Sequence, residues 1–140
     1  IHRDRLVKLV AAAFDLARVN AKRADSILGV VPRGHRKGVE PAILWDLAVD
    51  PASWGGFRVD PAGTRPVDHV PLREIANAMR AVCSDSGGAE RGELHRDVLA
   101  IFGFKRLTQG IEVRMDEALD HALREALLER RGTSYVAGQR

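Results

Sequence analysis

The chain has 140 residues, of which 45% are hydrophobic and 29% charged, and a formal net charge of +3 at pH 7. Such a chain is typical of one soluble globular domain or two very small ones. It contains no run of about 18 apolar residues, which excludes a membrane-spanning helix. The single cysteine, Cys83, excludes an internal disulfide and favours a reducing, cytoplasmic setting. Because the chain begins at Ile1 rather than Met, we expect it to be a piece of a longer protein.

Positive charge is concentrated at the start of the chain. Residues 1–40 contain nine Lys and Arg against four Asp and Glu, residues 41–70 contain two against four, and residues 71–140 contain eleven of each. Any attraction to an anionic polymer is therefore expected in the first part. A solvated Arg-rich surface without such a partner is the alternative.

Two helices are predicted before residue 32. The first, over about residues 3–17, follows from apolar residues at helical spacing, namely Leu6, Leu9, Val10, Ala13 and Ala17. Asn20 is a good N-cap for the second, over about residues 21–31, which Pro32 ends. A basic loop, "RGHRKG", follows over residues 33–38.

The middle of the chain predicts a hairpin and a connection. Residues 42–49 and 56–60 are rich in strand-forming types, and a turn-like "DPASWGG" separates them. Trp45, Trp54 and Phe57 lie here, and they either pack over a small core or form a platform for base stacking. Residues 60–71 hold three prolines, and we interpret residues 60–70 as a linker.

Three more helices and a hairpin are predicted after this linker. The first covers about residues 72–84, and Cys83 lies on its apolar stripe, so we expect a buried, inert thiol. The second ends near Gly103, and Thr108 is the N-cap of the third. Residues 127–138 predict a short terminal hairpin.

The triplet His-Arg-Asp occurs at residues 2–4 and again at residues 95–97. In protein kinases this triplet acts together with a glycine-rich loop and an Asp-Phe-Gly motif, which this chain lacks. Both copies also fall within predicted helices. We therefore interpret the repetition of the triplet as accidental.

An offset of 88 residues aligns the two halves better, without a gap over 31 residues. It pairs Arg3 with Arg91, Leu6 with Leu94, Val10 with Val98, Ala12 with Ala100, Phe14 with Phe102 and Arg18 with Arg106. The N-cap candidates Asn20 and Thr108 coincide as well. "FDLAR" and "FGFKR" thus predict two copies of one helix–turn–helix corner.

Each predicted corner is followed by a predicted hairpin, so we expect a mainly α fold with small β-hairpins, built of tandem winged-helix-like units. The first unit is expected over residues 1–59, the linker over residues 60–70 and the second unit over residues 71–140. Residues 72–84 supply the first helix of the second unit. The corresponding helix of the first unit is expected before Ile1.

Two stretches of the chain resemble a known family. "VPLREIANAMRAV" with "ERGELHRDVLAIFGFKRLTQGIEVRMDEALDHAL", and "IHRDRLVKLVAAAFDLARV", resemble the C-terminal domain of unknown function of large bacterial fusion proteins. In those proteins a superfamily 1-type helicase precedes a restriction-endonuclease-like module and then this domain. The resemblance covers most of residues 1–31 and 70–128. It implies an accessory module of a nucleic-acid-processing machine, in genome or anti-phage defence, with the helicase and nuclease regions of the parent chain as partners.

The second helix of a helix–turn–helix enters the major groove of DNA at its N-terminal end. This predicts DNA or RNA contacts in the first unit from Arg18, Asn20, Lys22, Arg23, Arg33, Arg36 and Lys37. In the second unit only the corner residues Lys105, Arg106, Thr108 and Gln109 are suitable, because the helix after them is acidic. For Arg18 and Arg106, structural pairing with a carboxylate or with helix-end carbonyls is the alternative to phosphate contact.

No catalytic or metal site is predicted. The chain has no Walker A sequence, no Asp…Glu-x-Lys nuclease core and no Ser-His-Asp set with a nucleophile elbow. Its five histidines lack metal spacing, and His95 and His121 are expected to be surface or boundary residues of helices. We expect a non-enzymatic module without cofactors, which binds nucleic acid through its first unit. A protein-docking or homodimerisation module is the alternative.

Overall fold

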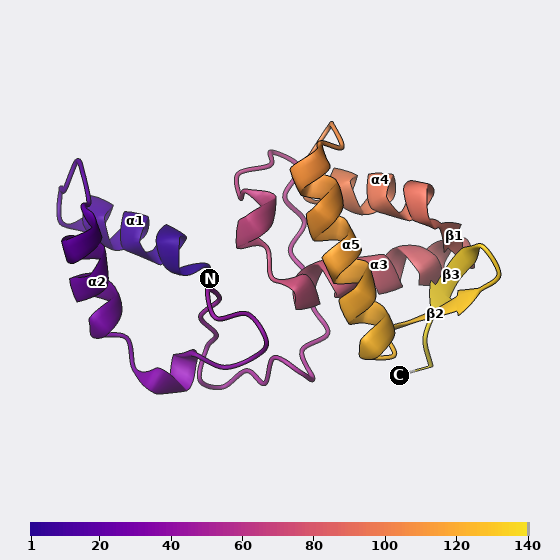
Figure 1. The fold of residues 1–140 in the computed structure, drawn as a ribbon, viewed down its shortest axis with the longest axis horizontal. Helices are drawn as coiled ribbons and strands as arrows, with labels where there is room; N and C mark the ends of the chain where they lie inside the picture. Colours follow the sequence, from indigo (N-terminus) through magenta and orange to yellow (C-terminus); the bar gives the residue numbers. More distant parts are fainter. Residues whose placement is uncertain (140) are drawn as a thin grey trace. The chain divides into compact units, whose positions relative to one another are not determined.

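The computed structural model describes residues 1–139 and divides into two compact units, residues 1–54 and residues 55 onward. The described residues form five α-helices and one three-stranded antiparallel sheet (Figure 1). None of these helices is long and apolar enough to cross a membrane. Position 140, which ends the predicted second unit, lies outside the described residues.

The first unit consists of α1 (Arg3–Ala13), α2 (Ala21–Gly29), the 3-10 turn η1 (Arg33–His35) and an irregular segment up to residue 54. The two predicted helices are confirmed, although both end earlier than expected. α1 packs against α2, and a single β-bridge joins His2 to Ile43. The buried apolar residues of this unit are Val7, Ala11, Ile43 and Leu44.

The hairpin predicted from residues 42–49 and 56–60 is wrong, since the structure has no strand over residues 1–59 beyond that one bridge. Two aspartates explain this outcome. The Asp46 carboxylate accepts a hydrogen bond from the Ala48 N–H (2.8 Å), and the Asp50 carboxylate accepts one from the Ala52 N–H (3.1 Å). Such bonds two residues along the chain form turns in place of a strand ladder.

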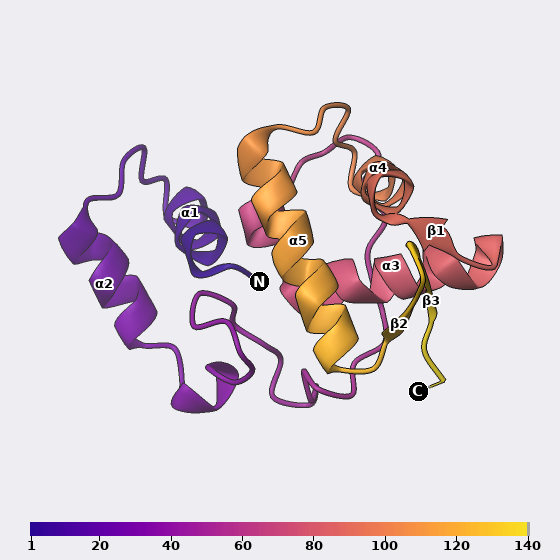
Figure 2. The same ribbon diagram turned by 45° about the vertical axis from the view of Figure 1, so that its right-hand side comes forward.

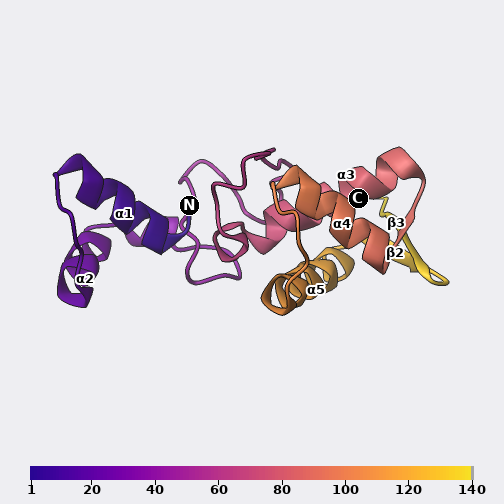
Figure 3. The ribbon, with the colours of Figure 1, turned by 90° about the horizontal axis from the view of Figure 1, so that it is seen from above.

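The second unit contains α3 (Leu72–Ser86), β1 (Ala89–Glu90), α4 (Arg91–Ile101), α5 (Gln109–Arg124), β2 (Leu128–Arg131) and β3 (Ser134–Ala137). α3 packs against both α4 and α5. The strands have the order β1-β3-β2, and the sheet lies at one end of the helices (Figure 2 and Figure 3). The terminal hairpin is confirmed, with pairs from Leu128 and Ala137 to Arg131 and Ser134.

The core of the second unit is formed mainly by the facing sides of its three helices. Its fully buried large side chains include Ile75, Met79, Leu94, Val98, Phe102 and Met115. Cys83 is buried as predicted, and burial raises the pKa of its thiol. Residues 60–70, interpreted above as a linker, lie inside this unit, where Val67 and Val70 join the core.

A buried carboxylate at the start of α3 binds two arginines from the segment before it. Glu74 is fully buried and accepts two hydrogen bonds from the Arg65 guanidinium (2.8 and 3.0 Å). The Arg58 guanidinium donates two more hydrogen bonds to Glu74, and the backbone N–H of Arg58 donates a further one. Burial alone would raise the pKa of Glu74, but the bonds from Arg65 and Arg58 outweigh it and hold this pKa below its ordinary value. Arg65 also lies over the ring of Phe102 at 5.8 Å.

The two corners that the 88-residue offset aligns have the same backbone hydrogen bonds. In the first, the N–H of Leu16 donates to the carbonyl of Ala11, and in the second that of Phe104 donates to Leu99, each at 2.9 Å. Asp15 and Gly103 occupy the left-handed region, with φ of 55° and 78°. Both corners are therefore Schellman motifs.

The two corners differ in what covers them. A Cβ at Gly103 would collide with the backbone of Asp60 and Gly63, so the turn over residues 60–63 packs directly on the second corner. Phe102 is 2% exposed, whereas Phe14 at the corresponding position of the first corner is 74% exposed. The shared backbone is therefore local, and the covering is a tertiary feature of the second unit.

Glu74→Gln is expected to lower the free energy of unfolding of the second unit by about 3 kcal/mol, because it leaves the buried guanidinium of Arg65 without a counter-charge. Chemical denaturation followed by circular dichroism measures this change. The control is Glu117→Gln, on an exposed carboxylate 3.5 Å from Arg114, with an expected change below about 0.5 kcal/mol. Equal effects of the two substitutions would contradict the role assigned to Glu74.

Gly103→Ala is expected to destabilise the second unit by about 2 kcal/mol or more, since an alanine there has an unfavourable φ and collides with residues 60–63. Asp15→Gly is the matched change in the first unit. It is expected to leave the stability unchanged or raise it by up to about 1 kcal/mol, because it only relieves a left-handed φ. Thermal unfolding of both variants tests the pair, and a harmless Gly103→Ala contradicts it.

Candidate nucleic-acid interface

Four predicted contact residues of the first unit lie at the N-terminus of α2. Asn20 is confirmed as the N-cap, because its side chain accepts a hydrogen bond from the Arg23 N–H at 2.8 Å. The side chains of Arg18, Lys22 and Arg23 are exposed, and their charged groups form no hydrogen bond or ion pair within residues 1–139. The N–H groups of the first turn add partial positive charge at this end of the helix. The Asn20 side chain itself is occupied by capping.

The basic loop over residues 33–38 is used largely within the unit. The Arg36 guanidinium donates to the carbonyl of Leu28 at the end of α2 (2.9 Å), and the Lys37 ammonium donates to the carbonyl of Leu47 (3.0 Å). A cation at a helix C-terminus is favourable there. Arg36 and Lys37 thus each make a structural contact, and the phosphate contacts predicted for them stay predictions. Of the three Lys and Arg residues in this loop, only Arg33 has no partner in the described part of the chain.

The net charge of the chain belongs to the first unit. Residues 1–54 contain nine Lys and Arg against six Asp and Glu, and residues 55–140 contain thirteen of each. In the second unit Arg91 binds Asp116 (2.7 and 2.9 Å) and Glu112 (3.1 Å), so much of the acidic face of α5 is neutralised internally. These bonds raise the pKa of Arg91 above its ordinary value.

The predicted contact residues of the second unit remain at its corner. Thr108 is confirmed as the N-cap of α5, and its hydroxyl accepts from the Ile111 N–H at 3.3 Å. Lys105, Arg106 and Gln109 are exposed. Neither Arg106 nor its counterpart Arg18 forms an ion pair or reaches a helix-end carbonyl in residues 1–139, so the structural pairing considered for them is not observed.

The aromatic residues of the middle segment pack within the units. Trp45 and Trp54 of the first unit meet edge to face, with ring centroids 5.5 Å apart. Phe57 is partly buried against the core of the second unit. Of the two interpretations given for these aromatic residues, Phe57 therefore follows the first, which is packing over a core.

A groove lies beside the corner in each unit, and sequence analysis missed both. The groove of the first unit has a volume of about 530 Å³ and that of the second about 450 Å³. When the two halves are aligned with the offset of 88 residues, six aligned pairs of residues line the two grooves, including Lys8 with Arg96 and Leu16 with Phe104. Arg96 is thus a cation beside the second corner that the sequence prediction did not include. The alignment of Lys8 with Arg96, two basic residues, was the signal that could have identified it.

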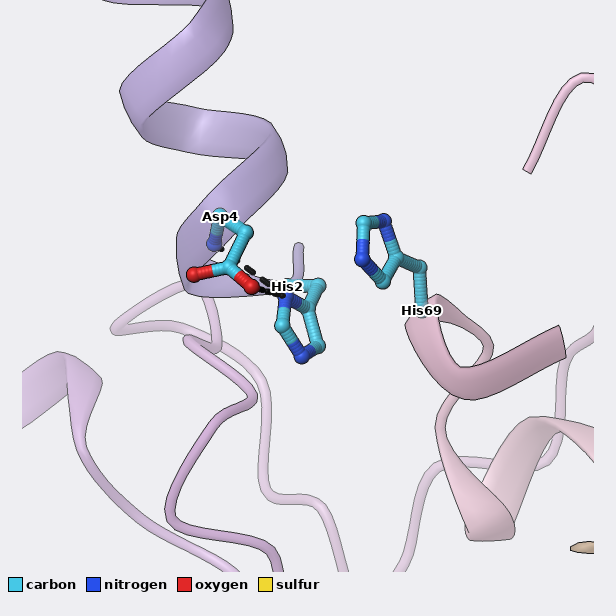
Figure 4. A group of neighbouring side chains, drawn as sticks. All are labelled: His2, Asp4 and His69. Atoms are coloured by element: carbon cyan, nitrogen blue, oxygen red, sulfur yellow. Dashed lines mark hydrogen bonds and ion pairs between the residues drawn. The ribbon is translucent and has the colours of Figure 1, made fainter. Parts of the chain in front are cut away.

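Histidine environments depart from the sequence prediction. His95 and His121 were expected at the surface or boundary of helices, but they are buried, at 0% and 5% exposed. His2 is the N-cap of α1, where its ring accepts a hydrogen bond from the Asp4 N–H at 3.1 Å (Figure 4). His69 belongs to the 3-10 turn η2 (Val67–His69) of the second unit.

Comparison with known protein families, with curated proteins and with solved structures found no match to this chain. The resemblance to the C-terminal domain of helicase–nuclease fusion proteins therefore stays a prediction.

The stability of the second unit is expected to fall as the pH falls from about 7 to about 5, in part through His95. Burial lowers the pKa of His95, and Arg91 lowers it further against the opposing effect of Asp116. The neutral ring is therefore favoured in the folded state. As the pH falls through the ordinary histidine pKa, the unfolded chain gains a proton before the folded chain does, so the folded state loses stability relative to the unfolded state. Within residues 1–139 neither ring nitrogen has a hydrogen-bond partner, and the Asp116 carboxylate lies 3.8 Å from Nε2.

The variant His95→Leu removes this titration and keeps an apolar side chain in the core. Its free energy of unfolding, measured over the same pH series, is expected to depend less on pH than that of the unchanged chain. Identical slopes would show that His95 does not contribute.

Proposed function

We propose that the chain is a non-catalytic module that binds DNA or RNA through its first unit. The observation that carries this proposal is the group of three exposed cations, Arg18, Lys22 and Arg23, at the N-terminus of α2. This group lies in the unit that holds the whole net positive charge of the chain. The resulting contacts are with phosphates, which give affinity without sequence preference.

The geometry of α2 supports this proposal. A helix N-terminus attracts anions through its free N–H groups and its dipole. α2 has no buried residue, so its first turn is open to a ligand. In a helix–turn–helix, that turn is the part of the second helix that approaches the nucleic acid.

We also propose that the second unit is a winged helix. The order helix, strand, helix, corner, helix, hairpin in the second unit is that of a winged helix. We interpret the first unit as a reduced copy of it, limited to the helix–turn–helix, because the two corners share their hydrogen bonds at an offset of 88. The exposed Glu117 and Asp120 on α5 disfavour the second unit as the main contact with phosphates.

The resemblance noted from the sequence supplies the context of this proposal. It favours an accessory role beside the helicase and nuclease regions of a larger parent protein, with no catalytic residue contributed by this chain. Those regions are the first partners to test by co-purification.

A protein-docking function is the second candidate, and a specific observation favours it. The first unit exposes several large apolar side chains, namely Leu9, Phe14, Val30, Val39 and Leu47, between 53% and 81%. Exposed apolar surface of this kind marks interaction sites. Light scattering distinguishes self-association through this surface from a monomer that binds nucleic acid.

Lys22→Ala combined with Arg23→Ala is expected to weaken the binding of a labelled duplex and to reduce the dependence of log K on log salt by about 0.9 per lost phosphate contact. Fluorescence anisotropy over a salt series, with a duplex and a single strand, measures both quantities. Arg124→Ala combined with Arg131→Ala removes the same charge from the second unit and is expected to have little effect. No binding by the unchanged chain at about 50 mM salt contradicts the proposal.

A further inference from the structure

The groove of the second unit has an apolar floor. Leu99, Phe104 and Leu107 line it, and Leu99 is 3% exposed while Leu107 is 42% exposed. Phe104 is half-buried and packs against the core, so the floor continues the core outward. A floor of this kind stabilises apolar side chains that enter from solvent.

The rim of this groove is cationic. Arg96, Lys105 and Arg106 line it, their side chains are exposed, and they form no ion pair within residues 1–139. No Asp or Glu is among the lining residues.

This unpaired charge stands out because the second unit contains equal numbers of basic and acidic residues. Many of its other arginines are within 4 Å of a carboxylate, namely Arg58, Arg65, Arg73, Arg91, Arg114 and Arg131. The groove is therefore lined by positive charges that no carboxylate of the described part of this unit neutralises.

The wall of the groove is fixed in place. Pro61 lines it and belongs to a turn whose Asp60 carboxylate accepts hydrogen bonds from the N–H groups of Thr64 (2.9 Å) and Arg65 (3.2 Å). The Asp60 N–H donates to the carbonyl of Ile101 at 2.8 Å, and Gly63 packs against Gly103. A groove with a fixed wall binds with a smaller ordering cost.

The corresponding groove of the first unit provides a comparison. It is lined by Lys8, Ala11, Ala12, Leu16, Ala17 and Val19, which align with Arg96, Leu99, Ala100, Phe104, Lys105 and Leu107. Its lining also includes Asp4, and Lys8 is its only basic residue. The two grooves thus share their position beside the corner and differ in charge.

We propose that the groove of the second unit is a docking site for an acidic peptide segment of a partner protein, which inserts one or two large apolar side chains. The floor contacts the apolar side chains, and the three cations bind flanking carboxylates. This site is separate from the phosphate-binding surface proposed for the first unit. A nucleic acid fits the groove less well, because base stacking uses open aromatic faces and the only aromatic lining residue, Phe104, is half-buried in the core packing.

The test uses the whole chain and a fluorescein-labelled synthetic peptide in which a central Leu-Phe pair is flanked on both sides by Asp and Glu. Arg96→Glu is expected to weaken its binding about tenfold, and Leu107→Ser about fivefold. Lys8→Glu, the same charge change at the aligned position of the first unit, is expected to change the affinity by less than about twofold. Circular dichroism and thermal unfolding verify that each variant is folded.

Three outcomes overturn the proposal. Equal weakening by Lys8→Glu and Arg96→Glu would mean attraction by the overall charge of the chain. Equal binding of a peptide with Gly-Ser in place of Leu-Phe would mean that the floor is not used. Displacement of the peptide by an oligonucleotide whose own binding is lost in Arg96→Glu would make the groove a nucleic-acid site. Loss of oligonucleotide binding only in the Lys22 and Arg23 variant leaves this proposal intact.

Discussion

The architecture of the second unit depends on the carboxylate of Glu74. It lies at the start of α3, is fully buried, and accepts hydrogen bonds from Arg65 and Arg58. Arg65 in turn covers Phe102 at the corner between α4 and α5. One ion-pair network therefore joins the incoming segment, the first helix and the corner. Removing the charges of Glu74 and Arg65 from water is costly, so each is stable there only with its partner, and this ties those three parts of the chain to one arrangement.

The first unit has the same helix–helix corner but, within residues 1–54, no ion-pair network that covers it. Its corner has the same hydrogen bonds and the same left-handed residue position, because these follow from local sequence and capping. Its aromatic residue, Phe14, is nevertheless exposed, since no helix equivalent to α3 and no equivalent of Arg65 covers it within residues 1–54. Local sequence thus determines the turn, and tertiary contacts determine whether the turn becomes part of a core. The thin core of this unit is consistent with a module that gains contacts from a ligand or partner.

The sequence predicted the structure correctly where the determining interactions are local. The five helices, the N-caps Asn20 and Thr108, and the terminal hairpin follow from periodicity, capping and turn chemistry. It failed where a distant partner decides. Residues 60–70 resemble a linker by their prolines, yet Arg65 and Val67 are buried by contacts with the helices that follow. His95 resembles a surface residue of a polar helix, yet it is fully buried in the packed unit, with its ring 3.8 Å from the Asp116 carboxylate of α5.

The same limit applies to the candidate site. Counting charges located the basic part of the chain, but it could not distinguish a cation bonded to a carbonyl, such as Arg36, from a free one, such as Arg23. The free cations then divide by what surrounds them. Those at the start of α2 stand on a helix turn that has no apolar side chain larger than alanine, so a phosphate backbone can approach them without covering an apolar floor. Those around Arg96 border a recess lined by leucine and phenylalanine, where a purely ionic ligand would leave the apolar floor in water. The difference in surroundings, more than the charge itself, is the reason to assign these two surfaces to different classes of partner.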